Sequence, residues 1–170
     1  MRFNEKYHLT YCTNIHAGGN WEETFDSLKQ HLPQIKKAVC PDQPFGLGLR
    51  LGNRASLELG QGHLQDFKEW LNHEDCYIFT MNGFPYGNFH GEPVKDKVHV
   101  PDWTTPERLD YTLRLFKQLD VLAPEGMECG ISTSPVSYKH WFDSKTKMQQ
   151  ALVKGAKNMV RVAVELYQME

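Results

Sequence analysis

The feature that most limits how this chain can fold is an alternation of short strand-like runs with longer helical patterns. The predicted strands are 7–14, 45–51, 76–82 and 128–134, and a helical pattern follows each of them. Strands separated by helices pair in parallel, joined by right-handed crossovers. The sequence therefore predicts an α/β protein with four β/α repeats, forming a single domain over residues 1–170.

The helical patterns have recognisable starts and buried faces. Asn20 caps the first helix, and Glu23 completes a variant of the capping box. Its apolar face has spacings of four, three, four and three, in Trp21, Phe25, Leu28, Leu32 and Ile35. A broken helical stretch covers 54–72. Thr105 and Pro106 open a helix whose buried face is predicted at Leu109, Leu113, Phe116 and Leu119. Ser144 opens the last, running through Met148, Leu152, Met159, Ala163 and Leu166.

Two architectures fit this order of elements: an open four-stranded parallel sheet, and the N-terminal half of a TIM (β/α)8 barrel. The run 45–51 favours the half barrel, because its odd positions are bulky and apolar while its even positions are Gly46, Gly48 and Arg50. A sheet covered by helices on both faces is bulky on both. A barrel of about 250 residues is typical. We therefore expect a barrel half that is truncated at its C-terminus.

Composition excludes several classes of function. Lys and Arg total 19 against 21 Asp and Glu, so the formal charge of −2 gives no overall field for nucleic acid or an anionic membrane. No apolar run is long enough to span a membrane, and no signal-peptide core follows Met1. The four cysteines lack zinc spacing; Cys12, Cys76 and Cys129 fall in runs predicted to be buried strands. We expect free thiols and a cytoplasmic protein.

Polar side chains at the carboxyl ends of the predicted strands are the candidate ligand-binding residues. They are Asn14, His16, Arg50, Asn82, Ser132 and Thr133. Each also has a structural explanation: the asparagines are common turn formers, His16 lies in a glycine-containing loop, and Ser132 and Thr133 are ordinary at strand ends. Arg50 needs an anion or a structural partner, because an apolar strand seldom carries a buried guanidinium.

The segment 83–105 has little regular pattern and follows Asn82 directly. Connections of this length in compact domains are often binding loops or lids. Its aromatic side chains, Phe84, Tyr86 and Phe89, could exclude water from a small polar ligand while His90 supplies a proton or a hydrogen bond. The alternative is a purely structural cover. Lys95, Lys97 and His99 could face a phosphate, although a solvated run of charges fits them better.

Several familiar signatures are missing from the sequence. It contains neither a phosphate-binding glycine loop, nor a dinucleotide fingerprint, nor a nucleophile elbow. Metal chemistry has no complete ligand set in this chain, because His16 and His90 alone would not hold a divalent ion tightly.

Five segments together closely resemble the EboE family. They are LTYCTNIHAGGNW, PFGLGLRL, FTMNGFPYGNFHG with VK after two further residues, VPDWTTPERLDYTLRL and GISTSP. Members of that family are called metabolite-traffic proteins and belong to the xylose isomerase-like TIM-barrel superfamily. The resemblance runs from Tyr7 to the C-terminus and implies that Asn14, His16, Arg50, Asn82 and His90 line the barrel mouth.

The resemblance also implies chemistry that this chain does not complete. Barrels of the superfamily usually bind a divalent metal (Mn, Mg, Zn or Co) through side chains that come mostly from later strands. EboE-like chains are about twice as long as this one, so we expect the metal only in the full-length protein, with ligands mostly beyond residue 170.

Three functional hypotheses follow. The first is a sugar or polyol isomerase or epimerase, with His16 and His90 in catalysis and Asn14, Arg50, Asn82, Phe84, Tyr86 and Phe89 binding the substrate. This half alone is then expected to be inactive. The second is a non-catalytic, cytosolic protein that binds or hands over a small metabolite. The third is an interaction module whose open half-barrel edge pairs with another chain, for example as a homodimer.

Overall fold

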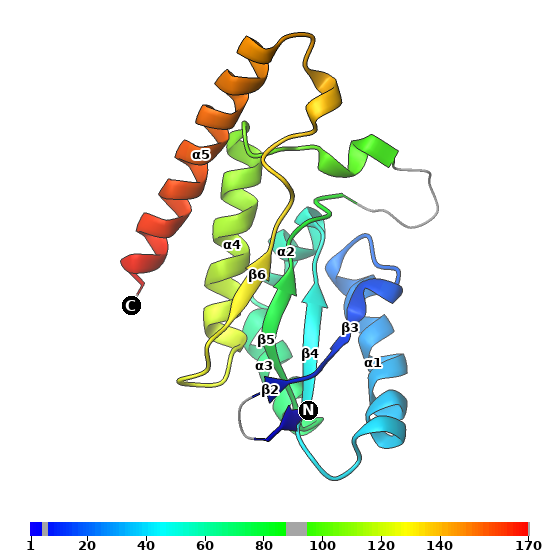
Figure 1. The fold of residues 1–170 in the computed structure, drawn as a ribbon. Coiled ribbons are helices and arrows are strands. Elements are labelled where there is room, and N and C mark those ends of the chain that lie inside the picture. Colours follow the sequence, from blue (N-terminus) through cyan, green and yellow to red (C-terminus); the bar gives the residue numbers. More distant parts are fainter. Residues whose placement is uncertain (5–6, 88–94, 170) are drawn as a thin grey trace.

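The computed structural model describes residues 1–4, 7–87 and 95–169 (Figure 1). In chain order its elements are β1 (Arg2–Phe3), β2 (Tyr7–His8), β3 (Thr10–Cys12), η1 (Thr13–Ile15), α1 (Trp21–Val39), β4 (Phe45–Arg50), α2 (Asn53–Leu59), α3 (Leu64–His73), β5 (Cys76–Asn82), η2 (Lys95–His99), α4 (Pro106–Leu122), β6 (Gly130–Ser132), η3 (Lys139–Trp141) and α5 (Lys145–Tyr167). The symbol η marks a 3-10 helix.

The central sheet contains four parallel strands in the order β3-β4-β5-β6, which is also their order in the chain. Cys12 pairs with Gly48, Gly48 with Thr80, and Thr80 with Gly130, so one register line crosses the whole sheet. The predicted α/β class and the four-stranded parallel sheet are confirmed. An open sheet and the first half of a barrel share this arrangement.

One face of the sheet packs against the helices. Leu47 and Leu49 of β4 and Ile78 of β5 are almost completely buried in a core with Leu28 of α1 and Leu115 of α4. The alternation predicted for the run 45–51 therefore holds, with its bulky residues on the helical side. β4 is the best enclosed strand, since all six of its residues are buried.

The other face carries Gly46 and Gly48 beside the larger Tyr77 and Phe79, and it is partly covered by the hairpin of β1 and β2. Near the amino ends of the strands, the Met1 ammonium donates to the Tyr77 hydroxyl (3.1 Å), and the His8 ring packs against Phe79 with ring centres 5.1 Å apart. The hairpin crosses the lower part of the sheet in Figure 1. Any ligand on this face must therefore lie nearer the carboxyl ends.

The single strand predicted over 7–14 is wrong in detail. The chain instead forms β2, which pairs antiparallel with β1, then β3 in the main sheet, and then the 3-10 turn η1. The Leu9 N–H donates to the Met1 carbonyl, which holds the chain in the hairpin before it enters the sheet. The predicted strand 128–134 is also shorter, since β6 covers only Gly130–Ser132.

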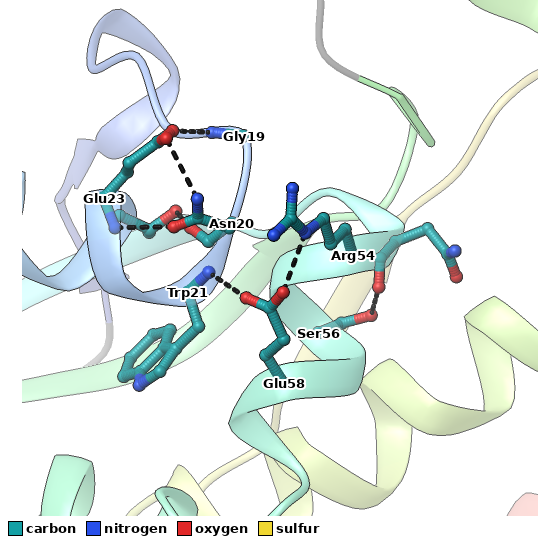
Figure 2. Close-up of polar contacts among 9 residues, drawn as sticks. Gly19, Asn20, Trp21, Glu23, Arg54, Ser56 and Glu58 are labelled. Atoms are coloured by element: carbon teal, nitrogen blue, oxygen red, sulfur yellow. Dashed lines mark hydrogen bonds and ion pairs between the residues drawn. The ribbon is translucent and has the colours of Figure 1, made fainter.

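The predicted helix starts are confirmed. Asn20 accepts from the Glu23 N–H at 2.8 Å, and the Glu23 carboxylate returns to the Gly19 N–H (Figure 2). Thr105 and Ser144 cap α4 and α5 through their hydroxyls. Figure 2 also shows a link between helices that the sequence did not predict: Glu58 of α2 accepts from the Trp21 N–H at the start of α1.

The buried face predicted for α4 is confirmed at Leu109 and Leu119, but elsewhere the predictions for α4 and α5 need correction. In α4 the fully buried side chains are Arg108, Tyr111 and Leu115, because this helix holds loops as well as packing on the sheet. Its predicted Leu113 and Phe116 are only partly buried, against α5. In α5 the buried residues are Gly155, Asn158 and Val162, whereas Leu152 and Ala163 are exposed.

The cysteines are free thiols, as expected, but they differ in burial. Cys40 and Cys76 are buried, whereas Cys12 is exposed and Cys129 is intermediate. The prediction that Cys12 is buried is wrong, because β3 is an edge strand and Cys12 lies on the face away from the helices. Among the described residues, no helix is both long and apolar enough to cross a membrane.

Candidate functional site

The carboxyl ends of β4, β5 and β6 bring three predicted site residues into one row. Arg50 pairs in register with Asn82, and Asn82 pairs with Ser132. Because alternate residues of a strand share a face, these three lie on the same face as Gly48, Thr80 and Gly130, away from the helical core. The sheet register alone therefore assembles a guanidinium, an amide and a hydroxyl.

The amide of Asn82 is held by its oxygen. Asn82 Oδ1 accepts from the Phe84 N–H (3.0 Å) and from the Ser132 hydroxyl (3.2 Å). Over the described ranges, Asn82 Nδ2 has no hydrogen-bond partner within the protein. This oriented amide can thus donate to a ligand without losing its structural contacts.

Arg50 is 4% exposed and joins two loops to the sheet. Its Nη2 donates to the Gly87 carbonyl (2.6 Å), and its main-chain N–H donates to Thr13 Oγ1 (2.9 Å). Burial lowers the pKa of the guanidinium, and the nearby Tyr111 hydroxyl opposes that shift. The sequence predicted that Arg50 needs an anion or a structural partner, and the loop after β5 supplies a structural partner through the Gly87 carbonyl.

Asn14 follows Thr13 directly and so lies next to the main chain of Arg50. Its Oδ1 is buried and accepts no hydrogen bond from any residue in the described ranges. A buried acceptor without a donor costs free energy of about 1–3 kcal/mol unless water or a ligand supplies one. Asn14 is therefore a second polar group that a bound molecule could satisfy.

His16 contacts residues of β3 and α1. Its Nε2 is 2.8 Å from the Tyr11 hydroxyl, and its ring stacks on His31 of α1 with centroids 4.8 Å apart. These contacts tie the His16 ring to the first strand of the central sheet and to the first helix. The other predicted catalytic residue, His90, and the predicted binding residue Phe89 lie outside the described residues.

Phe84 and Tyr86 face different surroundings. Phe84 contacts the ring of His99, with centroids 5.4 Å apart, at the carboxyl side of the sheet. Tyr86 packs edge-on against Tyr111 of α4, and the Arg108 guanidinium lies 5.8 Å from its ring centre. Tyr86 therefore contributes to the packing between the loop and α4.

His99 belongs to an aromatic cluster rather than to a solvated run of charges. Its ring stacks on Tyr138 (5.0 Å between centroids) and contacts Phe84 and, edge-on, Trp141. Lys97 is exposed, as expected for solvent-facing charge. The cluster connects the loop after β5 with the loop after β6, so the half-buried His99 corrects the expectation for 95–99.

Sequence reasoning missed Arg108, which fixes both ends of the segment 83–105. Its Nε donates to the Pro101 carbonyl (2.8 Å), its Nη1 to Gly83 (2.7 Å) and its Nη2 to Phe84 (3.1 Å). Burial lowers the pKa of this guanidinium. The signal was present, because Arg108 lies seven residues before Leu115, on the same helical face.

The described residues do not suit a metal ion. No three His, Cys, Asp or Glu side chains gather closely enough to ligate one anywhere in these ranges. A groove of about 730 Å³ lies between Pro101, Trp141 and Lys154, but Arg50, Asn82 and Ser132 do not line it. The candidate site is therefore an array of neutral hydrogen-bonding groups beside a buried cation.

Comparison of the chain with known protein families, with curated proteins and with solved structures found no match.

Proposed function

We propose that this chain binds a small polyhydroxylated metabolite, such as a sugar or polyol, at the carboxyl ends of β4, β5 and β6. The proposal rests on the row of Arg50, Asn82 and Ser132, in which the Asn82 amide is oriented by its oxygen while its nitrogen can still donate. Hydroxyl groups both donate and accept, so they match an amide N–H, a serine hydroxyl and the acceptor of Asn14.

The order of the strands supports the half barrel over the open sheet. Right-handed crossovers between strands in strict chain order place every helix on the same side. Doubly wound sheets instead reverse the strand order and cover both faces. The four-stranded order here has no reversal, which fits the xylose isomerase-like barrel implied by the EboE resemblance.

The glycines of β4 support the same choice. A Cβ on Gly46 would lie 2.8 Å from the Leu9 carbonyl, and one on Gly48 would lie 2.8 Å from Thr10 Oγ1. Gly46 thus lies directly beneath the main chain of the N-terminal segment, and Gly48 lies between the side chains of Thr10 and Thr80 on the two neighbouring strands, as residues do inside a barrel. Bulky residues would close the space beneath the proposed ligand.

The reaction class rests on the resemblance alone. An isomerase or epimerase of this superfamily would take its divalent metal through residues outside this chain, so we expect the chain by itself to be inactive. The second candidate is a cytosolic protein that binds and hands over a metabolite without converting it. The neutral hydrogen-bonding groups of the row fit this role equally well.

The test is an NMR titration of the ¹⁵N-labelled chain with xylose, myo-inositol and their phosphates. We expect the main-chain amides of Asn82, Gly83 and Ser132 and the side-chain NH₂ of Asn82 to shift together. Asn82→Asp keeps an acceptor for Phe84 and Ser132 but removes the donor, so it should abolish the shifts. Asn72→Asp, at an exposed position of α3, is the matched control.

Two results would contradict the proposal: no shift with any of these probes, or shifts that survive Asn82→Asp. Turnover assays separate the two candidate functions. If the intact protein binds a probe but neither binds a metal nor converts any sugar, the isomerase hypothesis is wrong and the handover hypothesis remains.

A further inference from the structure

The outer side of α5 carries a row of apolar residues, here called the seam, whose members are spaced alternately three and four residues apart. The seam consists of Val153, Ala156, Val160, Ala163 and Tyr167. All five side chains are exposed, Val160 to 61% and Tyr167 to 79%. A spacing of three and four is the pattern of helices that pack along each other in a coiled coil.

This seam is not needed for the packing of the chain itself. α5 is anchored by Gly155, Asn158 and Val162, which are buried on another side of the helix. Asn158 Nδ2 donates to the Trp103 carbonyl (2.8 Å), and Val162 packs in a cluster with Leu109 of α4. In Figure 1, α5 lies beside α4 at the outside of the molecule.

We propose that the seam binds a second copy of this chain, with the two α5 helices antiparallel and related by a two-fold axis. In this alignment Val153 lies opposite Ala163 of the second copy, and Ala156 lies opposite Val160. By symmetry the same two pairs form again, giving four layers that each contain one valine and one alanine. The layers are equal in volume, and the alanines let the helices approach closely.

The order of residues in the seam favours a second copy of the chain as the partner and an antiparallel orientation of the two helices. A two-fold interface must be self-complementary, because the same patch is used by both copies. The order valine, alanine, valine, alanine meets this condition when it is reversed against itself. A parallel pair would instead place valine on valine and alanine on alanine, so wide and narrow layers would alternate along the interface.

The contact predicts a weak dimer. Four layers from one helix per copy belong at the small end of protein interfaces, below about 1,200 Å² in total. We therefore expect a dimer that dissociates on dilution, and sedimentation should show a rise from the monomer mass of 19.7 kDa towards twice that value as concentration increases.

The first test compares two variants that each add a lysine to an exposed position of α5. Val160→Lys places a charge in two of the four layers, so it should keep the chain monomeric at every concentration. Glu165→Lys lies off the seam and should leave dimerisation unchanged. Lysine has a higher helix propensity than valine, so the Val160→Lys monomer should keep its thermal stability.

The second test measures orientation. In a Cys12→Ser and Cys129→Ser background, which keeps only the buried Cys40 and Cys76, the variants Val153→Cys and Ala163→Cys each add one exposed cysteine and are oxidised separately and as a mixture. Antiparallel packing gives disulfide dimers only in the mixture. Disulfides within either variant alone would overturn the antiparallel arrangement.

A third variant, Thr10→Lys on β3, distinguishes α5 from the open edge of the sheet. Our proposal expects this variant to dimerise normally. It is wrong if the wild-type chain stays monomeric at high concentration, if Val160→Lys still dimerises, or if Thr10→Lys alone prevents association.

Discussion

The guanidinium of Arg108 is completely buried, and it donates to three main-chain carbonyls. Those carbonyls belong to Gly83, Phe84 and Pro101, at the two ends of one connecting segment. Tyr111 supplements them, since its hydroxyl donates to the Leu51 carbonyl after β4. Polar side chains of α4 thus fix the loops that frame the candidate site.

Arg108→Met should be strongly destabilising. Methionine fills much of the space but leaves three buried acceptors without donors, at a cost of about 1–3 kcal/mol each. We expect the free energy of unfolding, measured with urea, to fall by about 3 kcal/mol or more. Arg161→Met, at an exposed position of α5, is the control and should change it by about 0.5 kcal/mol or less. Equal stability of the two variants would contradict the role assigned to Arg108.

Replacing Gly155 by alanine should destabilise the chain, although helix propensity alone predicts that it would stabilise α5. Alanine normally stabilises a helix by about 1 kcal/mol relative to glycine. Here its Cβ would overlap Val136 Cγ1 and approach Trp103 Cβ at 3.3 Å, and overpacking costs about 1–3 kcal/mol. Gly155→Ala should therefore lower the thermal midpoint. Gly130→Ala is the control and should not lower the midpoint, because nothing occupies the space at its Cβ. A higher thermal midpoint for Gly155→Ala would mean that the Val136 side chain moves aside at little cost.

Among the secondary-structure elements, α1 and α2 are connected through one carboxylate. Glu58 accepts from the Trp21 N–H at 2.8 Å and from Arg54 Nε at 2.8 Å (Figure 2). The pKa of Glu58 is lowered below its ordinary value of 4.5, mainly by the hydrogen bond from the Trp21 N–H and next by the hydrogen bond from Arg54. An ionised Glu58 thus supplies an acceptor to the free N–H groups at the start of α1.

The lowered pKa of Glu58 predicts a pH dependence. Its contribution to stability is present above pH 4.5, the unfolded value, and is lost as the pH falls through the lower folded value. Glu58→Gln should therefore be less stable than wild type near neutral pH, and the difference should close in acid. Urea denaturation across this range measures it, with Glu125→Gln in an exposed loop as the control. A constant difference would rule out the ionised contact.

The sequence predicted elements well where a single requirement set the pattern. Strands 45–51 and 76–82, the break in 54–72 and the three helix caps follow from apolar alternation and from capping chemistry. The N-terminal run was misread because strand-forming residues continue through Leu9, while only the antiparallel pairing of β2 with β1 shows that the chain turns there. The buried face of α4 was predicted only in part, because Arg108 and Tyr111 are counted as polar.

The candidate site was predictable to the extent that strand register defines it. Arg50 and Asn82 meet at the carboxyl edge because both end parallel strands. His16 could not be placed, since its position depends on contacts with Tyr11 and His31 across two elements. His99 was assigned to solvent because its neighbours, Tyr138 and Trp141, come from a distant loop.

On the scale of the whole molecule, β4 is enclosed and the two edge strands are not. All six residues of β4 are buried, whereas Thr10 and Cys12 of β3 and Gly130 and Ser132 of β6 are exposed. Edge strands with accessible main chain open at low free energy, and central strands open only with the whole fold. The protection of main-chain amides against hydrogen exchange should thus decrease from the middle of the sheet outwards.

Hydrogen exchange tests this order. We expect the amides of Leu47–Leu49 to exchange most slowly, those of β5 next, and those of β3 and β6 soonest. The measurement should be made at a concentration where the chain is monomeric, with Val160→Lys as a check. Equal protection of β4 and β6 would mean that another chain covers the sheet edge.

The clamp formed by Arg108 also affects how this protein can change. Because Arg108 holds the carbonyls of Gly83, Phe84 and Pro101 while Arg50 holds that of Gly87, sequence changes between positions 88 and 98 leave these anchor points in place. Selection, in nature or in a library, can then vary that stretch while the scaffold stays constant. Arg108 thereby lets the connection change separately from the sheet.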